Sequence, residues 1–193
     1  MMAHGLNGAR RPIRPSPPAL EPVRKIKTTV TFLEMRAEPH PHYPAPANLK
    51  LMLMRAEKPS LGFYRFLYDA VGRGYHWIDR KKLDDAALAA IIADTRVEIW
   101  VLYAAGQPAG YFEVNAIEAP VVELEYFGLM PEFHGRGLGK WFLAEAIRAC
   151  WARKPERVIV ETCTLDGPAA LPLYQKLGFV PYDRKEKTVE ISN

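Results

Sequence analysis

A glycine-rich stretch between a strand-like run and a helical pattern is the strongest constraint on this chain. It reads His134-Gly135-Arg136-Gly137-Leu138-Gly139-Lys140. Glycines at such a turn let backbone N–H groups approach a ligand, and the N-terminus of the following helix favours an anion. One helix end contributes only about 0.3 to 2 kcal/mol per charge, so several amides must share the binding, with Arg136 and Lys140 as cationic helpers. The stretch predicts a cradle for a diphosphate.

Two common phosphate-binding turns do not match this stretch. A Walker P-loop requires GxxxxGK[ST], whereas here Trp141 follows Lys140 and the glycine spacing differs. A Rossmann turn requires GxGxxG, whereas Gly135, Gly137 and Gly139 are spaced GxGxG. Neither motif explains the cradle.

Hydrophobic patterns on both sides of the cradle predict strands and helices in turn. We expect strands at 28–35, 49–55, 98–104, 110–115, 121–130, 157–164, 179–182 and 188–192, and helices at 61–71, 83–93, 142–151 and 168–177. The third and fourth strands are expected to form a hairpin through a turn at Gly106-Gln107-Pro108. This order of elements predicts an α/β (α+β) sandwich built on a mixed sheet.

Length and composition predict one domain with a tail. A chain of 193 residues with 49% hydrophobic content can bury one core. Residues 1–22 are rich in Pro and Arg and have no structural period, so we expect a disordered tail there and a single domain over 23–193. The net charge is only +4, and much of the basic excess lies in this leader. We therefore expect no nucleic-acid partner.

The sequence also carries expectations about compartment and oxidation state. It has no run of 18 apolar residues and no apolar leader, so we expect a cytoplasmic protein without membrane contact. Cys150 and Cys163 are too few for a disulfide framework and fall in apolar patterns, which predicts small buried hydrophobes. We expect no metal site. The oligomeric state stays open, a homodimer included.

The cradle sequence resembles a known family signature. Pro131-Glu132-Phe133-His134-Gly135-Arg136-Gly137-Leu138-Gly139 is similar to the acetyl-CoA motif of the GNAT superfamily of N-acetyltransferases, [Q/R]xxGx[G/A], usually found within a run of the type PEYRGKGIG. His134 stands where Gln or Arg is usual. The resemblance spans 49–179 in element order. It implies a mixed, mostly antiparallel sheet flanked by helices, with an extra N-terminal strand.

A second motif agrees with the first. The run GPAALPLYQKLGF, from Gly167 to Phe179, resembles the NxxAxxLYxKxGF segment of the same family, with Gly167 in place of Asn. Asp166 is expected to cap the helix that follows. Pro172 is expected to kink that helix or shorten its first turn.

The resemblance implies acetyl-CoA as the acyl-donor cosubstrate. Its contacts are expected on the strand before the cradle, on the cradle itself and on the second motif. These residues are Phe127, Gly128, Leu129, His134, Gly135, Arg136, Gly137, Leu138, Gly139, Lys140, Asp166, Gly167, Ala170 and Lys176.

Acyl transfer to an amine needs a base, an oxyanion donor and an acid for the leaving thiolate. Glu123 and Glu125 fall two apart in a strand, so we expect both on one face. The resemblance favours Glu123 as the base because it precedes His134 by the spacing found in histone acetyltransferases; Glu125 is the second candidate, since a bulge in this strand would exchange their directions. The resemblance also assigns the oxyanion donor to the amide near Leu129 and the acid to Tyr174.

The expected function is transfer of an acetyl group from acetyl-CoA to a primary amine of an unidentified small-molecule, peptide or protein acceptor. The alternatives are a catalytically silent CoA-binding sensor or structural module, and an enzyme for a longer acyl donor. Tyr75, His76 and Trp77 fall in a loop at 74–80 and are expected either to line the acceptor site or to fill the core.

Overall fold

The computed structural model describes residues 24–39 and 43–191. The predicted tail over 1–22 lies outside these residues. The described strands are β1 (Arg24–Met35), β2 (Leu51–Arg55), β3 (Val97–Ala104), β4 (Gln107–Asn115), β5 (Val121–Leu129), β6 (Arg157–Cys163) and β7 (Val180–Ile191). The α-helices are α1 (Leu61–Gly72), α2 (Asp85–Ala93), α3 (Leu138–Trp151) and α4 (Ala170–Lys176). Within this described part, no helix has the length and apolar character needed to cross a membrane.

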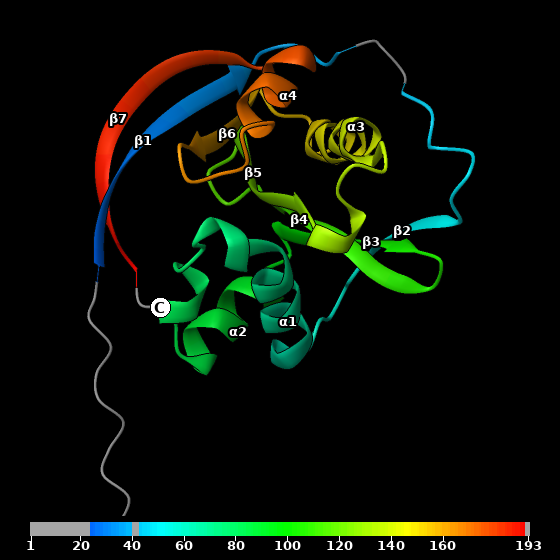
Figure 1. The fold of residues 1–193 in the computed structure, drawn as a ribbon, viewed down its shortest axis with the longest axis horizontal. Coiled ribbons are helices and arrows are strands. Elements are labelled where there is room, and N and C mark those ends of the chain that lie inside the picture. The colour runs from blue at the N-terminus through cyan, green and yellow to red at the C-terminus, as the bar shows by residue number, and fades with distance from the viewer. Residues whose placement is uncertain (1–23, 40–42, 192–193) are drawn as a thin grey trace, which may run out of the picture.

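The strands form one seven-stranded sheet in the order β2-β3-β4-β5-β6-β1-β7. Every neighbouring pair is antiparallel except β5 and β6, which run parallel and are joined by the crossover through α3. Helices α1 and α2 lie on one face of the sheet, and α3 and α4 lie on the other (Figure 1). The predicted mixed, mostly antiparallel sheet flanked by helices is confirmed.

The core lies on both faces of β4, an inner strand of the sheet. Successive side chains of a strand point to opposite faces, and here both faces are covered. Phe112 packs against Phe142 of α3 with ring centroids 5.5 Å apart, whereas Tyr111 meets Tyr64 of α1 at 6.4 Å. All four side chains are fully buried. The packing therefore fixes β4 and its neighbour β5 between the two helical layers.

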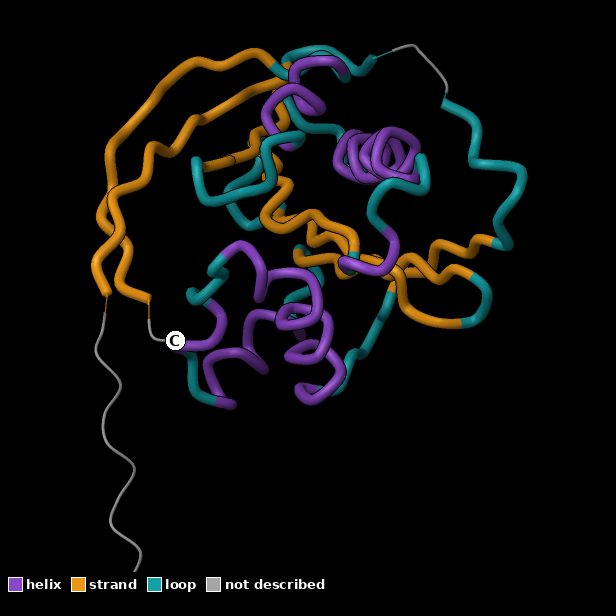
Figure 2. Tube along the Cα trace, viewed as in Figure 1, coloured by secondary structure: helices purple, strands orange, loops and turns teal. Residues whose placement is uncertain are grey.

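Strands β1 and β7 form a long curved ribbon at one end of the sheet (Figure 2). The prediction of two separate strands, at 179–182 and 188–192, is wrong because β7 runs unbroken from Val180 to Ile191. The charged run from Asp183 to Lys187 resembles a break in the sequence pattern. It lies on the edge strand of the sheet, where these side chains are exposed and solvated, so it continues as a strand.

The helix boundaries differ from the prediction near both family motifs. Helix α3 begins at Leu138, four residues before the predicted start. Helix α4 begins late, at Ala170, which places Pro172 in the first turn, where a missing N–H costs no intrahelical bond. The predicted capping role of Asp166 is wrong, because its carboxylate accepts hydrogen bonds from the Thr162 hydroxyl at 2.7 Å and the Cys163 N–H at 2.8 Å.

The hairpin between β3 and β4 is tighter than predicted. Ala105 and Gly106 both have positive φ values, 50° and 86°, which is the backbone of a two-residue hairpin turn. Gln107 and Pro108 already belong to β4. The turn is therefore displaced from the predicted Gly106-Gln107-Pro108.

Candidate functional site

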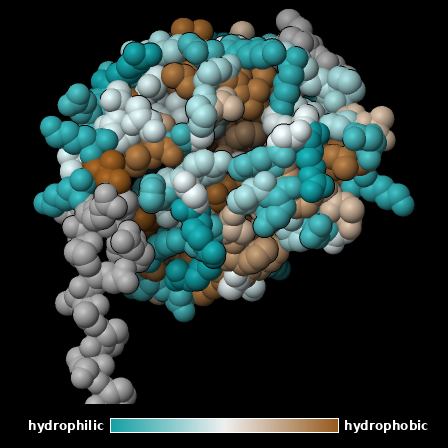
Figure 3. Space-filling view, in the orientation of Figure 1, coloured by the Kyte–Doolittle hydropathy of each residue, from teal (hydrophilic) through white to brown (hydrophobic). Residues whose placement is uncertain are grey.

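The site lies where β5 and β6 separate. The two strands pair only as far as Glu123 and Ile159. Beyond that point β5 follows β4 and β6 follows β1, so the sheet divides. A cavity of about 880 Å³ lies at this division, between the glycine-rich loop, the segment before α4, the α1–α2 connection and the β1/β7 ribbon. In Figure 3 this face is hollowed, with apolar side chains at the floor of the hollow.

The glycine-rich loop forms one wall of the cavity. Gly135 and Gly137 have φ values of 71° and 74°, a left-handed backbone that costs other residues about 1 to 2 kcal/mol. Gly137 is the N-cap of α3, so the first N–H groups of this helix and the positive end of its dipole lie at the cavity wall. The loop thus has the geometry of an anion cradle.

The backbone of β5 adds hydrogen-bonding groups to the same wall. The Met130 N–H donates to the Ala109 carbonyl at 2.8 Å. Because bonding directions alternate along an antiparallel strand, the N–H groups of Phe127 and Leu129 point away from β4, toward the division of the sheet. The Leu129 carbonyl and the His134 Nε2 are joined by a hydrogen bond of 3.0 Å, which connects the cradle to β5. The oxyanion role of the Leu129 amide stays a prediction.

Most of the predicted cofactor residues meet at this cavity. Arg136, Lys140 and Lys176 are not among the residues that line it. The Arg136 guanidinium lies 5.0 Å from the Phe133 ring centre and the Lys140 ammonium 4.0 Å from that of Tyr43, so both cations rest on aromatic faces. The predicted residues that do line it are Phe127, Gly128, Leu129, His134, Gly135, Gly137, Leu138, Gly139, Asp166, Gly167 and Ala170.

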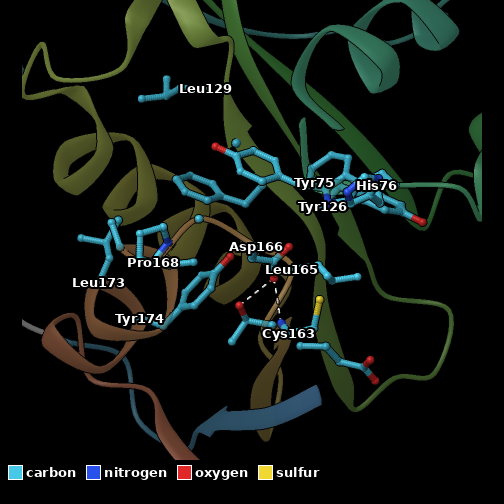
Figure 4. A pocket seen from close by; sticks show the side chains of 18 of the residues that line it. Tyr75, His76, Tyr126, Leu129, Cys163, Leu165, Asp166, Pro168, Leu173 and Tyr174 are labelled. Carbon is cyan, nitrogen blue, oxygen red and sulfur yellow. Dashed lines mark hydrogen bonds between the residues drawn. The ribbon is translucent and has the colours of Figure 1, made fainter. Parts of the chain in front are cut away.

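Tyr174 occupies both the core and the cavity wall. Its ring packs against Phe127 and Phe179, with centroids 6.3 Å and 5.8 Å away. The side chain is nearly buried yet lines the cavity, and in Figure 4 its hydroxyl points inward. Burial raises the pKa of Tyr174, and the negative charge of Asp166 raises it further. The phenol is therefore protonated at neutral pH and available as a proton donor.

One of the two predicted carboxylates, Glu125, lies in a β-bulge, and Glu123 lies two residues before it. Tyr126 pairs with Glu113 and Leu124 with Val114, so Glu125 is an additional residue in β5. Glu125 lines the cavity and accepts a hydrogen bond from the Asn115 amide at 3.0 Å. Glu123 is not among the lining residues, and burial, with repulsion from Glu125 and Glu161, raises its pKa to about 7. Both carboxylates thus stay candidates for the base: Glu125 because it lines the cavity, and Glu123 because its pKa is close to neutral pH.

Comparison with known proteins identifies the family. Residues 64–179 match the family model described as "Acetyltransferase (GNAT) family". This match covers about 60% of the 193 residues and contains the cradle, the bulged strand and Tyr174. The chain belongs to the GNAT acetyltransferase family. None of the curated proteins matches it closely enough to count as a relative.

Solved structures confirm the GNAT fold. An aminoglycoside acetyltransferase from an uncultured soil metagenomic sample is 15% identical, with a TM-score of 0.54 over 66% of this chain and 87% of that one. A tandem GNAT protein from the clavulanic acid biosynthesis pathway is 18% identical, with a TM-score of 0.56 over 84% and 53%. An IAA acetyltransferase from Bacillus cereus is 19% identical, with a TM-score of 0.51 over 69% and 79%. The chain spans 62% of another relative, from Staphylococcus epidermidis. At these identities the likeness is one of fold.

The aromatic loop of this GNAT domain both packs into the core and lines the cavity, and its contact with an acceptor stays a prediction. Trp77 packs against Tyr68 and Tyr126, with centroids 5.6 Å and 5.0 Å away, and also lines the cavity. Tyr75 approaches the bare backbone of Gly167, where an added Cβ would lie 3.5 Å from its ring. In Figure 4, Tyr75 and His76 face Pro168, Leu173 and Tyr174 across the cavity.

Several residues in or beside the cavity were not singled out from the sequence. Arg80 and Glu113 do not line the cavity but form a buried ion pair beside it, with Nη2 2.6 Å from Oε1. A carboxylate such as Glu113 within an apolar strand is a signal that a partner lies nearby, because burying it unpaired would be costly. A further group of lining residues comes from β6 and the ribbon, where only long-range pairing reveals their position. They are Thr28, Val30, Glu161, Thr162, Cys163, Lys187, Thr188 and Val189. Cys150 is buried as predicted, whereas Cys163 is half-buried.

Proposed function

We propose that this protein is an acetyl-CoA-dependent N-acetyltransferase that acetylates a primary amine. The observation that carries the proposal is the division of the sheet at β5 and β6, with the glycine cradle on one side of the cavity and carboxylates on the other. Family membership supports the reaction class. The volume of about 880 Å³ lies within the range of pockets that enclose small molecules and cofactors.

The residues at the cradle fit the donor. The N–H groups at Gly135 to Gly139 and the N-terminus of α3 suit the diphosphate of CoA. The N–H groups of Phe127 and Leu129 suit the arm that carries the thioester. We assign the Leu129 N–H to the developing oxyanion, and one such donor contributes about 3 kcal/mol to the transition state.

The chemistry requires several proton transfers. A carboxylate, Glu123 through a water molecule or Glu125 directly, takes a proton from the protonated acceptor amine and so leaves a neutral nucleophile. The amine nitrogen then forms a bond to the thioester carbon, and the bond from that carbon to sulfur breaks. Tyr174 gives its proton to the departing thiolate, and the second proton that the nitrogen loses as the amide forms restores the phenol. The products are an amide and CoA. A carboxylate with a pKa near 7 is well matched to the first step at neutral pH.

The acceptor is tested with a panel of amines. The panel contains simple mono- and diamines, peptides with free N-termini, and aminoglycosides. The aminoglycosides are included because one structural relative is an aminoglycoside acetyltransferase. Each reaction is followed by release of the CoA thiol and by the mass of the acetylated product. The proposal predicts thiol release that depends on one class of amine. Binding of acetyl-CoA without any acetylated product across the panel would instead favour a silent CoA-binding module.

A further inference from the structure

A buried arginine, Arg80, lies beside two carboxylates behind the cavity. Arg80 belongs to the α1–α2 connection, and its side chain is only 12% exposed. Its Nη2 donates to Glu113 Oε1 at 2.6 Å and lies 3.6 Å from Glu125 Oε1. Its guanidinium carbon lies 5.2 Å from the centre of the Tyr126 ring. Arg80 therefore contacts β4 and β5 at the point where β5 bulges.

Glu113 has no exposed surface and anchors this arginine. Tyr64 donates to its second oxygen at 2.6 Å, and Arg80 Nε donates to the same tyrosine hydroxyl at 3.2 Å. Burial raises the pKa of Glu113, but the two bonds and the charge of Arg80 favour its ionised form. Both partners of the carboxylate are donors, so we take Glu113 as ionised. The Nη2 atom that Glu113 holds also lies 3.6 Å from Glu125 Oε1, so the anchored guanidinium faces Glu125.

We infer that Arg80 is a positioning residue of the acceptor site: anchored by Glu113, it holds the Glu125 carboxylate at the cavity wall, and its positive charge acts on Glu123. This inference rests on the proposed function. Two like charges so close in a half-buried strand repel, and a cation behind them offsets this repulsion. Arg80 therefore affects catalysis through the carboxylates that it contacts, and it does not itself contact the acceptor.

The pKa of Glu123 depends on all the charged groups around Glu123 and Glu125. Arg80 acts on Glu123 from the α1–α2 connection, Glu113 from β4 and Glu161 from β6. Asp79 acts on Glu161, and the neutral amide of Asn115 donates a hydrogen bond to Glu125. Lys187 of the ribbon, 3.9 Å from Glu161, and Lys185 offset Glu161. Burial, Glu125, Glu161 and Glu113 raise the pKa of Glu123, and Arg80 lowers it.

The test separates the charge of Arg80 from its structural role. Glu113→Gln removes one negative charge and leaves Arg80 in place, so the pKa of Glu123 is expected to fall, by less than about one pH unit because Glu113 is the weakest of the charges acting on it. Adding Arg80→Gln removes the positive charge without stranding a buried carboxylate, and the pKa is expected to return toward the wild-type value. The pKa is followed by NMR of ¹³C-labelled glutamate carboxyls, with the Glu123 signal assigned from its loss in Glu123→Gln.

Turnover gives the second readout. At the pH optimum, the double variant is expected to lose about 10- to 100-fold in kcat relative to Glu113→Gln, because Glu125 is no longer held. The matched control is Glu98→Gln, which alters another buried glutamate, held by Arg55 and Arg153 at 3.2 Å and 3.1 Å, that does not line the cavity. It should leave the Glu123 pKa unchanged.

The outcomes distinguish this inference from the proposed function. Equal Glu123 pKa values in wild type, Glu113→Gln and the double variant would overturn it, since a purely structural Arg80 affects stability alone. The NMR titration needs no substrate. If the pKa moves as expected but no amine is acetylated, the positioning effect stands and the proposed acetyltransferase function fails.

Discussion

Tyr174 offers the most selective test of the proposed chemistry at the scale of single residues. Tyr174→Phe keeps the ring between Phe127 and Phe179 and removes only the hydroxyl. If the hydroxyl protonates the thiolate, kcat should fall by about 10² to 10⁴ while acetyl-CoA binding is retained. Tyr182→Phe on the exposed ribbon is the control. Full turnover in Tyr174→Phe, measured by thiol release, would remove Tyr174 from the mechanism.

Glu123 links stability and activity to pH. Its pKa is raised to about 7 from an ordinary 4.5, so its stabilising contribution is complete below pH 4.5 and is lost as pH rises through 7. At about 1.4 kcal/mol per pH unit, Glu123→Gln should make the protein more stable than wild type at pH 8 by at most about 3.5 kcal/mol. Denaturant unfolding at pH 5 and pH 8 measures this difference. The gain should be larger at pH 8.

The same residue governs the rate. A base must be unprotonated, so the wild-type rate should rise with pH around a midpoint near 7. Glu123→Gln should abolish this rise. A variant that keeps the same acidic limb would transfer the base role to Glu125, whose position on the cavity wall already suits it.

Single residues also show what sequence reasoning can locate. Motif spacing and strand alternation single out Glu123, Glu125 and Tyr174; Glu125 and Tyr174 line the cavity and Glu123 does not, and the catalytic roles of all three stay predictions. Arg80 and Glu113 are 33 positions apart, and only the packing of the α1–α2 connection against β4 brings them together. No local pattern in the sequence encodes that contact.

At the scale of elements, the glycine loop that begins α3 carries the next prediction. Gly137→Ala forces a left-handed backbone on a residue with a Cβ, which should cost about 1 to 2 kcal/mol in the free energy of unfolding. It should also weaken acetyl-CoA binding, because the cradle amides lose their alignment. Gly62→Ala in α1 is the matched control, since a Cβ there meets nothing within 4 Å, and it should stabilise by about 0.5 to 1 kcal/mol. Calorimetric titration would refute the cradle if both variants bound acetyl-CoA equally well.

Element boundaries follow the sequence where local chemistry decides them. Strands β3, β5 and β6 and helix α1 agree with their hydrophobic patterns to within a residue or two. The start of α4 and the continuity of β7 depend instead on tertiary context. Asp166 accepts a hydrogen bond from Thr162 of β6, so it does not cap α4 as its position in the sequence predicts. Strand β7 pairs with β1 along its length, so the charged run does not interrupt it.

At the scale of the whole molecule, the division of the sheet determines what the protein can bind. The order of elements predicts the sandwich, but the point where β5 leaves β6 and the ribbon that walls the cavity arise from pairings between distant segments. Val30 pairs with Cys163, and Thr28 with Lys187. Hydrophobic periodicity does not specify such partners, which is why the ribbon side of the cavity was not predicted.

The central claim, that the cavity at this division binds acetyl-CoA, is tested most directly by thermal unfolding with acetyl-CoA, CoA, ATP and NAD in separate samples. At about 100 times the dissociation constant, binding should add about 2.7 kcal/mol, which corresponds to a rise of about 5 to 11 °C in Tm for a chain of this size. We predict this rise with acetyl-CoA and CoA only. No rise with either CoA compound, or a rise with ATP or NAD instead, would contradict the account.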